Sequence, residues 1–190
     1  QALPSRVDRH ATDQRMEVER AVLRRALERF VRGQHLVVAL GAQLAPERIP
    51  GLADSGYNLY SLDGAAAIKN ARTQLTKGIL AVLVTRTPFK CPAAPYETAM
   101  LLEYDARKRR FRDRIEIALY TPEPGPMPVA GPEVSAGVQR LLEERGVRYY
   151  PRHRVVEVDG VGREIRFADG SRAPYDWLLY VAPHAAPAPV

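Results

Sequence analysis

The chain has 190 residues, with 28 Lys and Arg against 22 Asp and Glu, a formal net charge of +6 and 46% hydrophobic residues. This length suits one compact domain with attachments, and no stretch approaches the roughly 20 apolar residues that cross a membrane, so no membrane span is expected in this sequence. Most of the positive charge is arginine interleaved with acids, which is typical of a solvated face. No recognition motif accompanies it, so nucleic acid is not expected as a partner.

The sole cysteine, Cys91, cannot form a disulfide within the chain, and no signal-peptide pattern opens the sequence. A cytoplasmic protein is therefore the default expectation. No pair among the four histidines has metal-ligand spacing, so no metal is expected.

The first part of the chain gives two elements. Apolar residues recur every four positions between Met16 and Arg32, which favours an amphipathic helix, with the end of a hairpin over Leu27 to Leu36 as the alternative. His35 to Leu40 is predicted to be a short buried strand closed by Gly41-Ala42. A loop with turn residues follows over Pro46 to Gly56.

Strands and helices then alternate along the chain. Helices are predicted over Gly64–Leu75, capped by Asp63 or Ser61, and over Pro95–Lys108 and Glu133–Arg145. Strands are predicted over Ile79–Val84, Arg114–Tyr120, Val147–Tyr150, Arg154–Val158, Glu164–Phe167 and Tyr175–Val181. This order predicts an α/β fold, a Rossmann-like parallel sheet with helices on both faces plus a small antiparallel β-meander.

Cys91 lies in the loop after the strand predicted over Ile79–Val84, where dinucleotide-binding proteins carry a glycine-rich turn. The chain has no glycine between Gly78 and Gly125, so this turn lacks the residues that let a backbone approach a pyrophosphate. The following helix N-terminus and the neighbouring Lys90 both favour a thiolate, which makes Cys91 a candidate nucleophile. The alternative is a small buried hydrophobe, a common fate of a free cysteine.

Several segments carry a resemblance to a known family. They are Leu36–Ala42 (LVVALGA), Pro88–Glu97 (PFKCPAAPYE), Tyr120–Pro132, Asp169-Gly170 and Pro174–Asp176. Together they resemble the flavoprotein branch that contains sulfide:quinone oxidoreductases and flavocytochrome c sulfide dehydrogenases, which have the two-dinucleotide-domain, disulfide-reductase-like fold. The match covers about residue 35 to the end, and the cysteine loop is its most specific part.

The resemblance implies a division of the chain into four parts. Residues 1–34 are interpreted as an N-terminal extension or the remnant of an FAD domain, and residues 35–62 as the exit strand of that domain with a linker. Residues 63–183 are interpreted as an NAD(P)-binding-like Rossmann domain without its glycine-rich motif, and residues 184–190 as a tail.

The resemblance also implies roles for individual residues. Cys91 would be the catalytic cysteine near the flavin, which accepts sulfur as a persulfide or forms a flavin adduct. Gly41 and Ala42 would form the turn that passes close to FAD, where the absence of side-chain bulk is the physical requirement. Phe89 and Lys90 would shape the surroundings of the thiol, with a core aromatic and a solvated cation as the alternative interpretations.

Two departures from the family pattern limit what this chain is expected to do alone. Residues 1–34 contain no glycine-rich FAD fingerprint, and a second cysteine that some members carry near residues 57–64 is replaced by Tyr60 or a neighbour. The chain is therefore interpreted as a fragment of a larger flavoprotein. FAD is expected as the cofactor of the intact enzyme, and the isolated chain is expected to be inactive.

The leading hypothesis is a fragment of an FAD-dependent oxidoreductase that oxidises sulfide or a related sulfur compound and passes electrons to quinone or cytochrome. One alternative is a segment of an NADH-oxidising flavoprotein, which the glycine-free loop disfavours. Another is a non-catalytic interaction module derived from a flavoprotein. The resemblance leaves open a homodimer and a peripheral membrane location for the intact protein.

Overall fold

The computed structural model describes residues 17, 20, 21, 37 and 39–187. The chain divides into two units, one of residues 1–41 with 186–190 and one of residues 42–185. The helix or hairpin predicted between Met16 and Leu36 lies outside the described residues, apart from three helical positions at 17, 20 and 21.

The buried strand predicted over His35 to Leu40 is not found where the structure describes it. Val37, Ala39 and Leu40 belong to no strand, and Val37 and Leu40 are exposed. The strand that follows, β1, has only two residues, Gln43–Leu44. An apolar run is compatible with a buried strand, but it does not by itself supply the neighbouring strand that would bury it.

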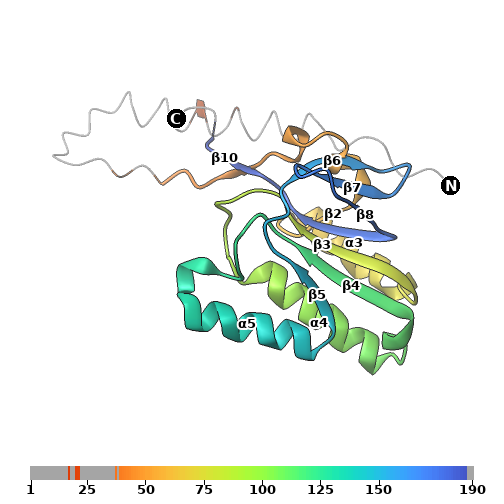
Figure 1. Ribbon diagram of the computed structural model, residues 1–190. Coiled ribbons are helices and arrows are strands. Elements are labelled where there is room, and N and C mark those ends of the chain that lie inside the picture. The colour runs from red at the N-terminus through yellow and green to blue at the C-terminus, as the bar shows by residue number, and fades with distance from the viewer. Residues whose placement is uncertain (1–16, 18–19, 22–36, 38, 188–190) are drawn as a thin grey trace. The chain divides into compact units, whose positions relative to one another are not determined.

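Five parallel strands form the central sheet of the second unit (Figure 1). In spatial order they are β2 (Tyr57–Asn58), β9 (Trp177–Val181), β3 (Gly78–Val84), β4 (Ile115–Tyr120) and β5 (Val147–Tyr150). The last five residues of β3 are all buried, as expected for a central parallel strand that is covered on both faces.

Three long helices connect the first four of these strands in chain order. They are α3 (Leu62–Gln74), α4 (Ala94–Lys108) and α5 (Pro132–Glu144). Each crossover runs in the same direction across the sheet, from the β2 side towards β5, so right-handed connection puts the three helices on one face. The chain returns from β5 to β9 in the opposite direction, which puts that connection on the other face.

The returning connection is an antiparallel meander. It consists of β6 (Val155–Asp159), β7 (Glu164–Phe167) and β8 (Arg172–Pro174). The 3₁₀ turn η1 (Pro46–Arg48) and the one-turn helix α2 (Leu52–Ser55) lie on the same side, because Ile49 and Leu52 share a core cluster with meander residues. Two further 3₁₀ turns, η2 (Arg112–Arg114) and η3 (Pro128–Ala130), occur in loops.

The sheet separates two hydrophobic clusters. Along β3, Leu80 and Val82 face the helices, whereas Ala81 and Leu83 face the meander. This alternation is the period of two that a strand imposes on its side chains. The fold expectation is confirmed: a Rossmann-like parallel sheet with flanking helices and an added meander. The meander, with α2, covers the face that lacks a long helix.

Most predicted elements have the expected positions within one or two residues. Ser61 is the helix cap, since its Oγ accepts a hydrogen bond of 3.0 Å from the Gly64 amide. Short elements escaped prediction: β1, β2, β8, the helix α2 and β10 (His184–Ala185), which pairs antiparallel with β1. The loop predicted over Pro46 to Gly56 therefore contains η1 and α2.

Candidate functional site

The carboxyl edge of the sheet brings together residues that are far apart in the sequence. Because β2, β9 and β3 are parallel neighbours, the segments that follow them leave the sheet at the same edge. Tyr60 follows β2, His184 follows β9 and Cys91 follows β3. In open α/β sheets this edge is where ligands bind.

The cysteine loop begins from a fixed point. Thr85 is fully buried, and its Oγ1 donates a hydrogen bond of 2.6 Å to the carbonyl oxygen of Val181 in β9. The Arg86 guanidinium donates to the carbonyl oxygens of Thr85 and Val155, at 2.8 and 2.7 Å. Burial, followed by the neighbouring Arg154 charge, lowers the pKa of Arg86. The strand end, the loop and the meander are thereby joined at the base of the loop.

Cys91 itself is exposed, so the alternative of a small buried hydrophobe is wrong. Its backbone has φ = 50°, in the left-handed region that non-glycine residues seldom adopt. The Cys91 carbonyl oxygen accepts a hydrogen bond of 3.0 Å from the Ala94 amide in the first turn of α4. The turn therefore leads directly into the helix N-terminus, as the sequence predicts.

Tyr60 contacts the cysteine from the β2 side. Its hydroxyl donates a hydrogen bond of 3.0 Å to the carbonyl oxygen of Cys91. Burial, followed by the electrostatic effects of Cys91 and Glu123, raises the pKa of Tyr60 to about 12. The hydroxyl therefore keeps its proton at neutral pH and remains a donor.

His184 contacts the same loop from the β9 side. Its Nε2 accepts a hydrogen bond of 3.4 Å from the Lys90 amide, and its Nδ1 lies 3.0 Å from the carbonyl oxygen of Ala182. An amide can only donate and a carbonyl can only accept, so these two contacts assign the proton to Nδ1 and the lone pair to Nε2. The ring also packs edge-on against Tyr60, with centroids 5.6 Å apart.

A short ribbon holds His184 in place. His184 is paired with Leu44 in the β1–β10 ladder, and the Ala45 amide donates a hydrogen bond of 2.8 Å to the carbonyl oxygen of Pro183. His184, which the sequence assigns to a tail, is therefore part of a strand beside the cysteine loop.

A second polar cluster lies after the next strand, β4. Glu123 is buried, and its Oε2 accepts hydrogen bonds from the Tyr96 hydroxyl at 2.5 Å and the Thr121 hydroxyl at 3.2 Å. Burial raises the pKa of Glu123, although both hydrogen bonds oppose the shift. Burial also raises the pKa of Tyr149 to about 12, and the buried Tyr149 hydroxyl has no hydrogen-bond partner among the described residues.

The residues proposed to hold a cofactor are placed as follows. Gly41 has φ = 70°, and a Cβ at this position would meet no atom of the described residues within 4 Å, so its backbone conformation explains the glycine. Ala42 is half-buried and immediately precedes β1. Phe89 is half-buried and belongs to neither core cluster, whereas Lys90 is exposed and its backbone amide contacts His184.

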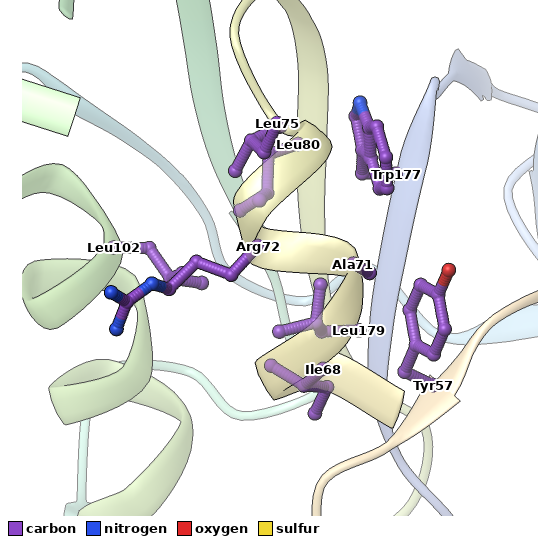
Figure 2. A pocket seen from close by; sticks show the side chains of 9 residues that line it. All are labelled: Tyr57, Ile68, Ala71, Arg72, Leu75, Leu80, Leu102, Trp177 and Leu179. Atoms are coloured by element: carbon purple, nitrogen blue, oxygen red, sulfur yellow. The ribbon is translucent and has the colours of Figure 1, made fainter. Parts of the chain in front are cut away.

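An apolar pocket lies away from these residues (Figure 2). Leu80 near the start of β3 and Trp177 at the start of β9 line it, together with side chains of α3 and α4, so it lies towards the amino ends of the strands. Arg72 is its one charged lining residue, and the Arg72 guanidinium forms an ion pair of 3.4 Å with Asp105. Its lining residues include no cysteine, histidine, serine, lysine or carboxylate.

No family model matches the sequence, and no curated protein matches it either. Solved structures do match. The chain is similar to the sulfide:quinone oxidoreductase of the hyperthermophilic bacterium Aquifex aeolicus, with 18% identity and a TM-score of 0.69 over 81% of this chain and 37% of that one. It is similar to an NAD-dependent persulfide reductase from A. fulgidus, with 19% identity and a TM-score of 0.58 over 76% of this chain and 25% of that one.

A chain in the Tetrahymena thermophila mitochondrial ATP synthase is also similar, with 12% identity and a TM-score of 0.62 over 78% of this chain and 40% of that one. The neighbours thus include FAD-dependent oxidoreductases of the pyridine nucleotide-disulfide oxidoreductase family. At these identities the likeness shows a shared fold. The chain spans less than half of the length of each of these structures.

No helix in the described part of the chain is long and apolar enough to cross a membrane.

Proposed function

We propose that this chain is the thiol-bearing Rossmann-like domain of an FAD-dependent oxidoreductase, in which Cys91 accepts sulfur from sulfide or a related sulfur compound. The observation that carries the proposal is the position of Cys91: an exposed thiol in the strand-to-helix turn where this fold ordinarily cradles a pyrophosphate. The fold shared with a sulfide:quinone oxidoreductase and a persulfide reductase supports it.

The backbone of Cys91 gives independent support. A left-handed conformation costs a non-glycine residue about 1 to 2 kcal/mol relative to glycine. A turn selected only for stability would therefore favour glycine at this position. Cys91, with φ = 50°, is one of five non-glycine residues with positive φ in the described part of the chain, and among these five it is the one that carries a nucleophile.

The cysteine loop does not form a cradle for a pyrophosphate. The cysteine loop contains two prolines, Pro88 and Pro92, which have no amide to donate, and it contains no glycine. In this proposal FAD is bound by protein outside the cysteine loop, and the division of residues 1–62 into an FAD-domain remnant and linker remains part of the proposal. Quinone or cytochrome as the final electron acceptor is likewise part of the proposal.

The chemistry at Cys91 balances simply. The Cys91 thiolate and a hydrosulfide ion form one sulfur–sulfur bond, which gives a persulfide and releases two electrons. A flavin supplies the two-electron acceptor when it is bound. Lys90, the residue before Cys91, offers an exposed cation that favours the approach of an anionic sulfur species.

The experiment combines two measurements on the full-length flavoprotein loaded with FAD. Sulfide is added in the absence of oxygen, and flavin bleaching is followed by absorbance. The peptide that contains Cys91 is then analysed by mass spectrometry for the mass increase of one sulfur atom. Wild-type protein is expected to bleach flavin and to gain sulfur, and Cys91→Ser is expected to do neither. Bleaching by Cys91→Ser at the wild-type rate would remove Cys91 from the mechanism.

Oxidation of NADH is the weaker enzymatic candidate. Rossmann domains that bind NAD use an acidic residue after the second strand to bind the ribose hydroxyls. Glu123 follows β4, the strand next to β3, but it is buried and already accepts hydrogen bonds from Tyr96 and Thr121. Tight NADH binding by the protein would reverse this ranking.

A non-catalytic module is the candidate from another class. The similarity to a chain of the mitochondrial ATP synthase favours it, because that structure is a large assembly and is not named as an oxidoreductase. A protein that stays colourless after addition of FAD, and that gains no sulfur at Cys91, would support this candidate.

A further inference from the structure

The contacts around the cysteine loop fall on the two peptide units that flank the Lys90–Cys91 linkage. Tyr60 donates a hydrogen bond to the carbonyl oxygen of Cys91, and His184 accepts one from the amide of Lys90. The two side chains therefore engage the backbone immediately before and immediately after the linkage between residues 90 and 91. Neither contact is to a side chain, so both act on the conformation of the loop.

That conformation needs support. Cys91 has φ = 50°, and the left-handed region is unfavourable for a residue with a Cβ unless surrounding contacts hold it there. The Cys91 carbonyl oxygen receives two hydrogen bonds, from Tyr60 and from the Ala94 amide, each of 3.0 Å. The sulfur has no hydrogen-bond partner among residues 39–187 and remains exposed.

The two contacting side chains are themselves fixed by the fold. Tyr60 lies between β2 and the Ser61 cap of α3, and its ring packs against that of His184. His184 is held by the β1–β10 pairing and by its own Nδ1 contact to Ala182. The two residues and the loop come from three adjacent parallel strands, so the sheet itself sets their spacing.

We propose that Tyr60 and His184 are positioning residues that clasp the peptide at Lys90–Cys91, hold Cys91 in its left-handed turn and so keep the thiol presented at the sheet edge. The inference takes its functional meaning from the proposed function of Cys91. The clasp itself is a property of the folded chain and can be measured without flavin or sulfide.

The test uses amide hydrogen exchange, read by NMR for the amides of Lys90 and Ala94. Tyr60→Phe removes the hydroxyl but keeps the ring, and His184→Ala removes the acceptor. Each lost hydrogen bond is expected to speed exchange of these two amides about fivefold, the factor that corresponds to a typical net hydrogen bond. Tyr104→Phe is the matched control, since Tyr104 is an exposed tyrosine on α4, and it should change neither amide.

A second background separates positioning from general stabilisation. Glycine adopts the left-handed region freely, so in Cys91→Gly the turn no longer needs the clasp. Tyr60→Phe should then speed exchange of the Ala94 amide by less than twofold. If Tyr60→Phe still speeds exchange of the Ala94 amide fivefold in the Cys91→Gly background, the proposal is overturned. Unchanged exchange in both Tyr60→Phe and His184→Ala, or an equal change in Tyr104→Phe, would also overturn it.

A parallel measurement links the clasp to sulfur chemistry. The rate of persulfide formation at Cys91 is followed by mass spectrometry during anaerobic treatment with sulfide and FAD. This rate is expected to fall about fivefold in Tyr60→Phe and His184→Ala, in line with the loss of one hydrogen bond. If wild-type protein forms no persulfide, the proposed function fails while the exchange results still decide whether the clasp exists. If persulfide forms equally fast in all variants whose exchange has changed, the thiol does not depend on the clasp and the proposal is wrong.

Discussion

Two polar clusters lie at the carboxyl edge of the same sheet and differ in the burial and hydrogen bonding of their side chains. After β4, Glu123 is buried and its carboxylate is bonded to Tyr96 and Thr121, so the cluster is closed to solvent. After β3, the hydrogen bonds hold only the backbone around Cys91, and the residue is exposed. The first arrangement satisfies its polar atoms within the core, and the second leaves the side chain of Cys91 open to solvent.

The difference also bears on the nucleotide positions of this fold. The position that ordinarily binds a ribose is filled by protein side chains, and the position that ordinarily binds a pyrophosphate carries a thiol. An account of function must therefore separate the two clusters. The following changes are expected to do so, beginning with the largest effect.

Removal of the buried carboxylate should cost most. Glu123→Ala leaves the Tyr96 hydroxyl buried without its acceptor, and Tyr96 is only 1% exposed. We expect the free energy of unfolding to fall by about 3 kcal/mol, the cost of leaving a buried donor without the carboxylate that accepted its hydrogen bond. Urea denaturation measures the change.

Glu144→Ala is the control for this substitution, because Glu144 is exposed near the end of α5. It should alter the free energy of unfolding by less than about 0.5 kcal/mol. Equal effects of the two substitutions would mean that the Glu123 cluster is not the stabilising one of the pair.

The pH dependence of stability should carry the signature of the same carboxylate. Burial raises the pKa of Glu123 in the folded protein above its value of about 4.3 in unfolded chains. The folded state therefore holds the proton more tightly, and this contribution to stability is complete below the unfolded pKa and lost as pH rises through the raised one. The loss amounts to about 1.4 kcal/mol for each unit by which the pKa is raised.

Glu123→Gln isolates this contribution, since the amide oxygen can still accept from Tyr96 but does not titrate. The difference in urea midpoint between wild type and Glu123→Gln should change across the acidic range and become constant above the raised pKa. Parallel midpoints throughout that range would show that Glu123 is not the group responsible.

The sequence predicts one part of this comparison and misses another. Strand β3 is predictable from the sequence because its apolar run is long enough for a strand buried on both faces and precedes a helix with a proline in its first turn. The thiol is predictable because it is an unusual residue for the turn between them. Tyr60 and His184 are not predictable from local pattern. They lie 31 positions before Cys91 and 94 positions after Lys90, and they meet the loop only because β9 inserts between β2 and β3.

The region before β1 shows the opposite failure. The run from His35 to Leu40 has the same composition as a central strand, but Val37 is 86% exposed. Strand formation depends on a partner to pair with, and composition alone does not provide one. The clasp could have been inferred from polar residues that directly follow neighbouring parallel strands. That inference requires the strand order to be known first.

The smallest effect tests whether Cys91 is retained against local stability. With φ = 50°, serine at residue 91 meets the same steric cost as cysteine, whereas glycine does not. Cys91→Gly is therefore expected to be more stable than Cys91→Ser by about 1 kcal/mol in urea denaturation, while Cys91→Ser stays close to wild type. Equal stabilities would show that the loop does not hold this residue in the left-handed region in solution. The exposed cluster would then need no clasp, and the contrast with the buried cluster would rest on burial alone.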